Sequence, residues 1–204
     1  MWKIYLTGEN LQSLVKNLKV IVKEKMSPLG GTAHSYSHVD RVVKIATFLA
    51  EKEKADLELV QIGALLHDIG WVLGQPHNQT GAKLAAEILE EINYPRQRIQ
   101  RIVSIVLLHP LDFKDKLSIL EEKIVWDADK MDLLGAVGIA RGFHWCGRKT
   151  FDEAVKLAFE TYPPIYDMLN TSSARELARK RHEETLSFLR ALKEELLLTD
   201  LSIG

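Results

Sequence analysis

The sequence predicts an all-α protein, a single helical domain with about eight or nine helices. In several segments apolar residues recur with the three- and four-residue spacing of a buried helix face. The strict alternation that marks a half-buried strand between turn residues is missing. The 6 prolines and 12 glycines stand mostly between the periodic segments. A chain of 204 residues that is 46% hydrophobic can bury a core as one domain, 1–204, with the core at about 30–195.

The first half of the chain contains three predicted helices before its second loop. An N-terminal helix is expected over about 9–26, packed on the core, and the loop 27–32 follows it. The next helix is marked by a stripe of apolar residues: Val39, Val42, Val43, Ala46 and Leu49. A shorter apolar helix covers 57–66, and the loop 74–78 ends this part of the chain.

The second half continues the helical pattern. One apolar face spans 84–92, and Pro95 suits the first turn of a helix that runs to about Leu108, where Pro110 ends it. A further helix is expected from Asp129 to Gly142; its glycines lower helix propensity, which a close approach of its backbone to another part of the chain would justify. The last helix is long, amphipathic and highly charged, and covers 172–198.

Composition and charge exclude several classes of protein. Disorder as the main state requires low hydrophobicity with high net charge, and this chain has a net charge of −1. The absence of a basic excess argues against nucleic-acid binding by bulk electrostatics. There is a single cysteine, Cys146, no apolar leader-like stretch near Met1, and no apolar run of about 20 residues. We therefore expect a cytoplasmic protein with no membrane and no nucleic-acid partner.

Chemistry-bearing side chains occur near helix ends. His67 and Asp68 end an apolar helix, where a buried carboxylate must be paired or bind a metal. Taken alone, this pair is also compatible with a helix cap and a core histidine. The pair is not isolated, however, because two further candidate ligands stand at helix starts: His38 opens one predicted helix and Asp129 another. Imidazole and carboxylate groups that converge from three segments suit one divalent ion.

The order His38, His67-Asp68, Asp129 resembles the H…HD…D pattern of the HD-domain metal-dependent phosphohydrolases. The segments 37–42, 64–70, 127–132 and 138–141 look like the small bacterial and archaeal HD hydrolases, some of which cleave nucleoside triphosphates to monophosphate and pyrophosphate. The resemblance covers about residues 30–195, including the C-terminal run 174–192. It implies the all-helical fold that the periodicity predicts.

The resemblance also implies a ligand set and a cofactor. His38, His67, Asp68 and Asp129 would bind a first divalent ion, with Mn²⁺ expected first and Mg²⁺, Fe²⁺, Co²⁺, Ni²⁺ or Zn²⁺ as alternatives, and Asp68 would also orient the attacking water. Members of the family with two ions have two further histidines before the final aspartate. His77 and His109 occupy those places in the order, so a second ion is one prediction; histidines that line the pocket, bind phosphate or cap helices are the other.

A phosphate substrate needs positive charge close to the ion. Arg41 lies three residues after His38 and Lys130 directly follows Asp129, so these two are predicted to bind phosphate and to assist catalysis with Asp68. Arg141 would lie about 18 Å along a helix from Asp129, which requires a long substrate or a structural ion pair. For each of these cations the alternative is a surface residue or a salt bridge.

Two other side chains complete the candidate site. His34 could face the substrate or stand behind a ligand, and Asp132 shares a helix face with Asp129. Four aromatic side chains are predicted to belong to the core or the pocket wall, with base stacking as an alternative role for one of them: Trp71, Trp126, Phe143 and Trp145.

The function expected from these residues is hydrolysis of a nucleotide with release of pyrophosphate. A 5′-nucleotidase-like phosphatase and a binuclear dinucleoside-polyphosphate hydrolase are alternatives. A nucleotide- or metal-sensing module without turnover is the alternative of another class. The partner is a small nucleotide or phosphoester, and the terminal helix could form the seam of a homodimer.

Overall fold

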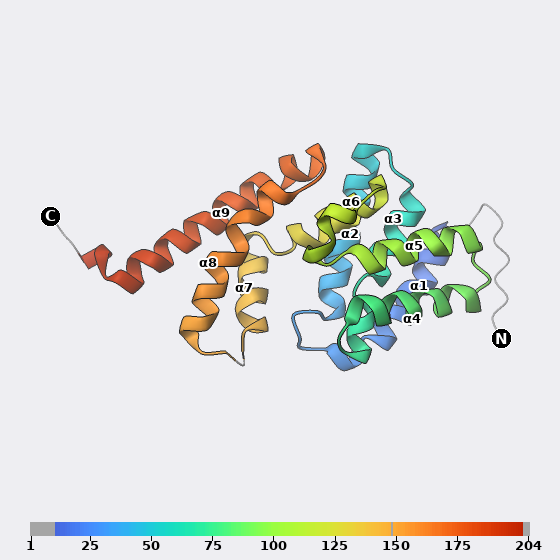
Figure 1. Cartoon of the computed structure of the whole chain (residues 1–204), viewed down its shortest axis with the longest axis horizontal. Coiled ribbons are helices and arrows are strands. Elements are labelled where there is room, and N and C mark those ends of the chain that lie inside the picture. Colours follow the sequence, from blue (N-terminus) through green and yellow to red (C-terminus); the bar gives the residue numbers. More distant parts are fainter. Residues whose placement is uncertain (1–10, 148, 202–204) are drawn as a thin grey trace. The chain divides into compact units, whose positions relative to one another are not determined.

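The computed structural model describes residues 11–147 and 149–201, which form helices joined by short loops, with no strand among them (Figure 1). The all-α prediction is confirmed, with nine α-helices in this part of the chain. Their bounds are α1 Leu11–Lys25, α2 Tyr36–Glu53, α3 Leu57–Leu66, α4 His77–Glu91, α5 Arg96–Leu108, α6 Leu120–Met131, α7 Gly135–Trp145, α8 Phe151–Met168 and α9 Ser172–Leu197. Residues 9 and 10 of the expected N-terminal helix lie outside the described residues.

The chain forms two compact units, 1–129 and 130–204. In the first unit α2 packs on α3, α4 packs on α5, and α3 also contacts α1 and α5. The core of this unit is made by the apolar stripes that the sequence predicts; Val39, Val42, Ala46 and Leu49 of α2 are fully buried. Whether the whole chain behaves as a single domain stays a prediction.

Three short 3₁₀ helices connect elements of the first unit, and the first of them, η1 (Ser27–Leu29), joins α1 to α2. The helix η2 (Ile69–Leu73) follows α3 after His67 and Asp68 and packs against α4. Gly70 makes that packing possible, because a Cβ there would lie 1.8 Å from the carbonyl oxygen of His77 and 2.5 Å from the amide nitrogen of Gly81. The helix η3 (Leu111–Lys116) follows α5, so that η2 and η3 both begin just after a histidine of the predicted site.

In the second unit α9 packs against both α7 and α8. Its core contains Ile139 of α7, Ala158 and Tyr162 of α8, and Leu189 of α9. The helices over 151–168 and 120–131 are not predicted from the sequence. Pro163 and Pro164 lie inside α8, where proline lacks the donor that a helix uses, which is why the sequence pattern there is weak.

One predicted helix is wrong in its bounds. Asp129 was expected to open a helix that continues to Gly142, but it lies in the last turn of α6, and a new helix begins at Gly135. The break occurs where Gly135 adopts φ +74°, a left-handed conformation that glycine reaches without steric cost. The expected close approach is found at Gly138, where a Cβ would lie 2.0 Å from the carbonyl oxygen of Leu133.

No single described helix has the length and apolar composition of a membrane span. Taken together, the segments 57–73 and 77–91 pass that test by length and composition, with a bend of 116° between them.

Candidate metal centre

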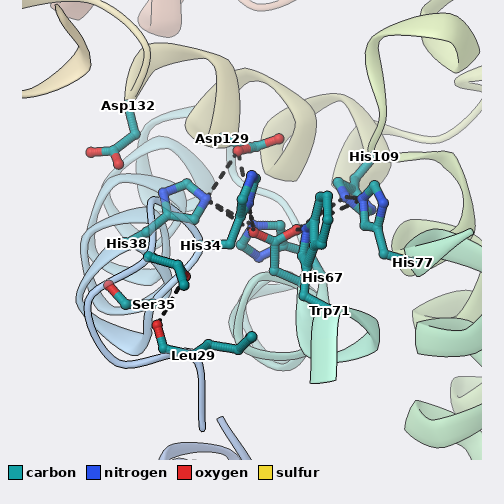
Figure 2. Close-up of polar contacts among 12 residues, drawn as sticks. Leu29, His34, Ser35, His38, His67, Trp71, His77, His109, Asp129 and Asp132 are labelled. Atoms are coloured by element: carbon teal, nitrogen blue, oxygen red, sulfur yellow. Dashed lines mark hydrogen bonds and ion pairs between the residues drawn. The ribbon is translucent and has the colours of Figure 1, made fainter. Parts of the chain in front are cut away.

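All the predicted metal ligands come together in the first unit, each placed at or near the end of a helix (Figure 2). His38 is the third residue of α2, and His67 and Asp68 follow the last residue of α3. His77 begins α4, His109 directly follows α5, and Asp129 lies in the last turn of α6. Helix ends are close enough here to bring six side chains from five helices to one place.

Four atoms define the first group of ligands: Nε2 of His38, Nε2 of His67, Oδ2 of Asp68 and Oδ1 of Asp129. The His38 nitrogen lies 3.5 Å from Asp68 Oδ2, 3.3 Å from Asp129 Oδ1 and 3.3 Å from the His67 nitrogen. The His67 nitrogen lies 3.6 Å from Asp68 Oδ2 and 3.9 Å from Asp129 Oδ1. Neighbouring ligands about 2.1 Å from one ion stand roughly 3.0–3.4 Å apart, so this group fits a small divalent cation.

The protonation of His67 suits metal binding. Its Nδ1 lies 2.7 Å from the carbonyl oxygen of Ala64, which can only accept, so Nδ1 carries the proton and Nε2 carries the lone pair. Burial lowers the pKa of His67 to about 4 and outweighs the carboxylates of Asp68 and Asp129, which raise it. A neutral ring whose Nε2 faces three other ligand atoms is the form that binds a metal.

A second group of ligands lies on the other side of Asp68. Its Oδ1 is 3.4 Å from Nε2 of His109 and 4.0 Å from Nε2 of His77, and the two histidine nitrogens are 3.1 Å apart. His109 repeats the arrangement of His67, because its Nδ1 donates to the carbonyl of Val106 at 2.7 Å. The Nδ1 of His77 lies 3.3 Å from Oε1 of Gln75.

These contacts leave two imidazole lone pairs facing each other. Burial, followed by the effect of His109, lowers the pKa of His77 to about 4, so its ring is neutral near pH 7. With Nδ1 as the donor in both rings, neither Nε2 has a proton to give to the other. Two lone pairs at 3.1 Å repel unless a cation lies between them, and the pair therefore fits a second ion.

Asp68 belongs to both groups, with one carboxylate oxygen on each side. Its side chain is 3% exposed. Burial alone would raise the pKa of its carboxyl, but the His67 ring and the hydrogen bond from His34 outweigh burial, and the pKa lies well below the usual value of 3.8. An ionised, buried carboxylate together with Asp129 leaves negative charge that divalent cations would neutralise.

Unlike the metal ligands, the residues predicted to bind the substrate do not all lie together in the first unit. His34 contacts the ligand set directly, since its Nδ1 donates to Asp68 Oδ2 at 2.8 Å. Arg41 is half-buried one turn beyond His38 on α2, and Lys130 is 6% exposed next to Asp129. In the second unit the Nη1 of Arg141 donates to Oδ2 of Asp132 at 2.8 Å and to its carbonyl oxygen at 3.0 Å.

Sequence reasoning placed Trp71 in the core or the pocket wall, but it did not connect this side chain with the carboxylate of Asp68. The indole is stacked against His34 and His77, and its Nε1 donates to Asp68 Oδ1 at 3.2 Å (Figure 2). The signal in the sequence is the spacing, because Trp71 follows Asp68 by three residues and this spacing lets the side chain return to the carboxylate. That signal is too common to have identified it alone.

Comparison with known proteins places this site in a family. The HD domain family model matches residues 35–134, and this segment contains every predicted ligand of both groups. The uncharacterized protein YpgQ of Bacillus subtilis is 33% identical over 180 residues, which cover 81% of this chain and 85% of YpgQ.

Solved structures share the fold as well. The crystal structure of B. subtilis YpgQ in complex with ADP aligns with a TM-score of 0.76 and 30% identity, covering 91% of this chain and 96% of that one. An HD-superfamily hydrolase from Bacillus thuringiensis aligns with a TM-score of 0.74 and 26% identity over 92% of this chain and 98% of that one. With the ligand groups in place, these matches show that the chain belongs to the HD-domain family and is a metal-dependent phosphohydrolase.

Proposed function

We propose that this protein hydrolyses a nucleoside triphosphate to the monophosphate and pyrophosphate. The observation that carries the proposal is the pair of ligand groups on the two oxygens of Asp68, with inter-ligand distances that suit small divalent ions. Support for a nucleotide comes from the relative YpgQ, whose crystal structure contains ADP. The bond that breaks joins phosphorus to a bridging oxygen; the water oxygen takes its place on phosphorus, and the bridging oxygen leaves with pyrophosphate.

The two ligand groups are the basis for proposing that divalent ions are the cofactor. His38, His67, Asp68 and Asp129 hold the first ion, and Asp68, His77 and His109 hold the second. Mn²⁺ is our first choice, because mixed imidazole and carboxylate ligands suit it, although Fe²⁺, Co²⁺, Ni²⁺, Zn²⁺ and Mg²⁺ stay alternatives. Such ions supply an activated water near neutral pH and withdraw charge from the phosphoryl oxygens.

The chain's own residues supply positioning and charge. We assign Asp68 the task of accepting a hydrogen bond from the attacking water, in addition to binding ions. Arg41 and Lys130 neutralise charge on the phosphates. His34, at 24% side-chain exposure and hydrogen-bonded to Asp68, is the candidate that contacts both solvent and the ligand set. A phosphate that bound Arg141 would compete with Asp132 for the guanidinium.

The group formed by Asp68, His77 and His109 supports a second candidate, a binuclear hydrolase of dinucleoside polyphosphates. A 5′-nucleotidase-like phosphatase uses the same first ligand group. We disfavour a sensing module without turnover, because degenerate modules usually lose a ligand and this chain keeps the complete first ligand group. The cytoplasmic location and the homodimer stay predictions.

A product assay separates these candidates. Purified protein is incubated with nucleoside tri-, di- and monophosphates and with dinucleoside polyphosphates, under Mn²⁺, Mg²⁺, Fe²⁺ or chelator, and His67→Ala serves as the inactive control. Pyrophosphate from triphosphates, absent with chelator and in the variant, is the expected result. Phosphate from monophosphates, or cleavage of dinucleoside polyphosphates alone, would replace the proposed substrate. Tight ion binding with no turnover of any of them would favour the sensing module.

A further inference from the structure

Trp71 lies between two imidazole rings, one on each face of its indole. The ring centroids of His34 and Trp71 are 4.4 Å apart with planes inclined by 25°, and those of Trp71 and His77 are 4.4 Å apart with planes inclined by 15°. Both faces of the indole are therefore covered by protein. A nucleotide base has no face of Trp71 left to stack on, so the base-stacking role considered for it is not available in this arrangement.

Two of these three residues, Trp71 and His34, also hold the carboxylate of Asp68. The indole Nε1 donates to Oδ1 at 3.2 Å, and Nδ1 of His34 donates to Oδ2 at 2.8 Å. Each oxygen thus receives one hydrogen bond from a ring of the stack. Each oxygen also faces one ligand group, Oδ2 toward His38 and Oδ1 toward His109. Two donors in fixed rings determine how the carboxylate is rotated between the groups.

The stack connects three separate elements. His34 precedes α2, Trp71 lies in η2, and His77 begins α4. Of these residues only His77 is a ligand candidate of the second group, and its ring has few other constraints: its polar contacts are with Gln75, His109 and, at 4.0 Å, Asp68. The face of the indole is the large surface that sets the plane of this ring.

We propose that Trp71 is a positioning residue of the metal centre. Its indole holds the rings of His34 and His77 parallel, and its N–H directs Oδ1 of Asp68 toward the second ligand group. The part of this proposal that concerns ion binding rests on the two-ion site of the proposed function. Hydrogen bonds from outside the ligand set to a ligating carboxylate typically change metal affinity by about 10- to 100-fold.

Two substitutions separate the hydrogen bond from the stack. Trp71→Phe keeps an aromatic face and removes the N–H, whereas Trp71→Leu removes both. Trp145→Phe is the matched control, because Trp145 lies on α7 and is 51% exposed. Metal-free protein is titrated with Mn²⁺ alone, and bound ions are counted by calorimetry and by the electron paramagnetic resonance signal of free Mn²⁺. Circular dichroism melting of the metal-free proteins reports whether each variant folds.

We expect the Trp71 substitutions to weaken binding of the second ion and not of the first. Trp71→Phe should weaken the second ion by about 10- to 100-fold and leave the first ion and the Trp145→Phe control at wild-type affinity. Trp71→Leu should weaken the second ion further, because the plane of His77 is no longer set. Wild-type binding of both ions by both Trp71 variants would overturn the proposal. Equal losses for both ions would also overturn it, since they would indicate general damage to the fold.

A second readout needs no metal. In the metal-free protein the ring protons of His34 and His77, assigned with His34→Asn and His77→Asn, should show upfield ring-current shifts from the indole. The shifts should shrink in Trp71→Phe, vanish in Trp71→Leu and persist in Trp145→Phe. If the wild type binds one ion only, the two-ion function fails, and these shifts then decide the stack: their presence supports it, and their absence in the wild type overturns it.

Discussion

The two sides of Asp68 differ in how firmly the fold holds their ligands. On the side of Oδ2, His38 and His67 are 1% and 0% exposed and lie on α2 and at the end of α3, two helices that pack on each other. On the side of Oδ1, His109 is 3% exposed, but the side chain of His77 is 15% exposed and stands at the first residue of α4. The two histidines of the first side are enclosed by core helices and only Asp129 there is partly exposed, at 12% of its side chain, whereas on the second side a histidine, His77, reaches the surface.

The difference in exposure indicates that one carboxylate serves two ligand groups of unequal rigidity. The buried side has its geometry set by helix packing, which changes little when a ligand leaves. The side of His77 depends on smaller supports: the stack with Trp71, the contact with Gln75 and the close approach at Gly70. We therefore expect changes on this side to act on one ion, and changes to Asp68 itself to act on both.

The largest effect is expected for Asp68→Asn, which keeps the shape of the side chain and removes its charge. Both ions lose a ligand, so metal content measured by mass spectrometry should fall from two equivalents to none. Hydrolysis should fall by more than about 100-fold, beyond the loss that an outer hydrogen-bond partner causes. Retention of one tightly bound ion would show that Asp68 is not shared between the groups.

His109→Ala is expected to act on one side only. The second ion loses a buried ligand, while the four ligands of the first remain, so metal content should fall to one equivalent. His67→Ala is the matched comparison, because each of the two histidines directly follows a helix and donates Nδ1 to a carbonyl three residues earlier. If both variants lost the same ion, the division of the site into two groups would be incorrect.

Gly70→Ala tests whether η2 must lie against the start of α4. The new Cβ would meet backbone atoms at 1.8 and 2.5 Å, and backbone cannot rotate away as a side chain can. Overpacking of this kind costs about 1–3 kcal/mol, so the melting temperature should fall and affinity for the second ion should decrease with it. Gln79→Ala, at an exposed position of α4, is the control and should change neither quantity. An unchanged second-ion affinity in Gly70→Ala would contradict the role of this contact.

The smallest effect is expected for Asp56→Ala, which concerns the support of α3 rather than a ligand. Asp56 accepts from the amide of Leu59 at the start of α3 and pairs with both terminal nitrogens of Arg98 at 3.0 and 2.9 Å. Loss of such a cap costs about 1–2 kcal/mol, measured by denaturant unfolding. Asp40→Ala, which breaks an exposed pair with Lys44, is the control and should cost under about 1 kcal/mol.

The same residue should make stability depend on pH. Although partial burial raises it, the hydrogen bonds from Arg98 and Leu59 hold the pKa of Asp56 below its ordinary value of 3.8. A lowered folded-state pKa stabilises the protein above the unfolded-state pKa, and this stabilisation is lost as the pH falls toward the folded-state value. The difference in unfolding free energy between wild type and Asp56→Ala should therefore shrink on acidification. A constant difference from pH 7 to pH 3 would rule out this contribution.

Much of the first ligand group could be predicted without coordinates. His38, His67, Asp68 and Asp129 stand at the places expected from the histidine and aspartate pattern, and the structure brings the Nε2 of each histidine within 3.9 Å of both carboxylates. The second group was predicted as two histidines in order, with pocket lining as the alternative. The helix break after Met131 was not foreseen, because an apolar pattern that continues through Gly135 and Gly138 looks like one helix.

From the sequence alone, helical periodicity predicted the helices of the first unit as far as Leu108 but not α6, because periodicity is a local property. The order of histidines and aspartates, through the family resemblance, supplied the candidate ligands. The tertiary structure alone decided the division of Asp68 between two ligand groups and the place of Trp71 between His34 and His77. These depend on how η2 lies against α4, on a glycine that admits that approach, and on the rotation of one carboxylate. Such contacts join residues from separate elements, and only the packing of those elements sets their distances.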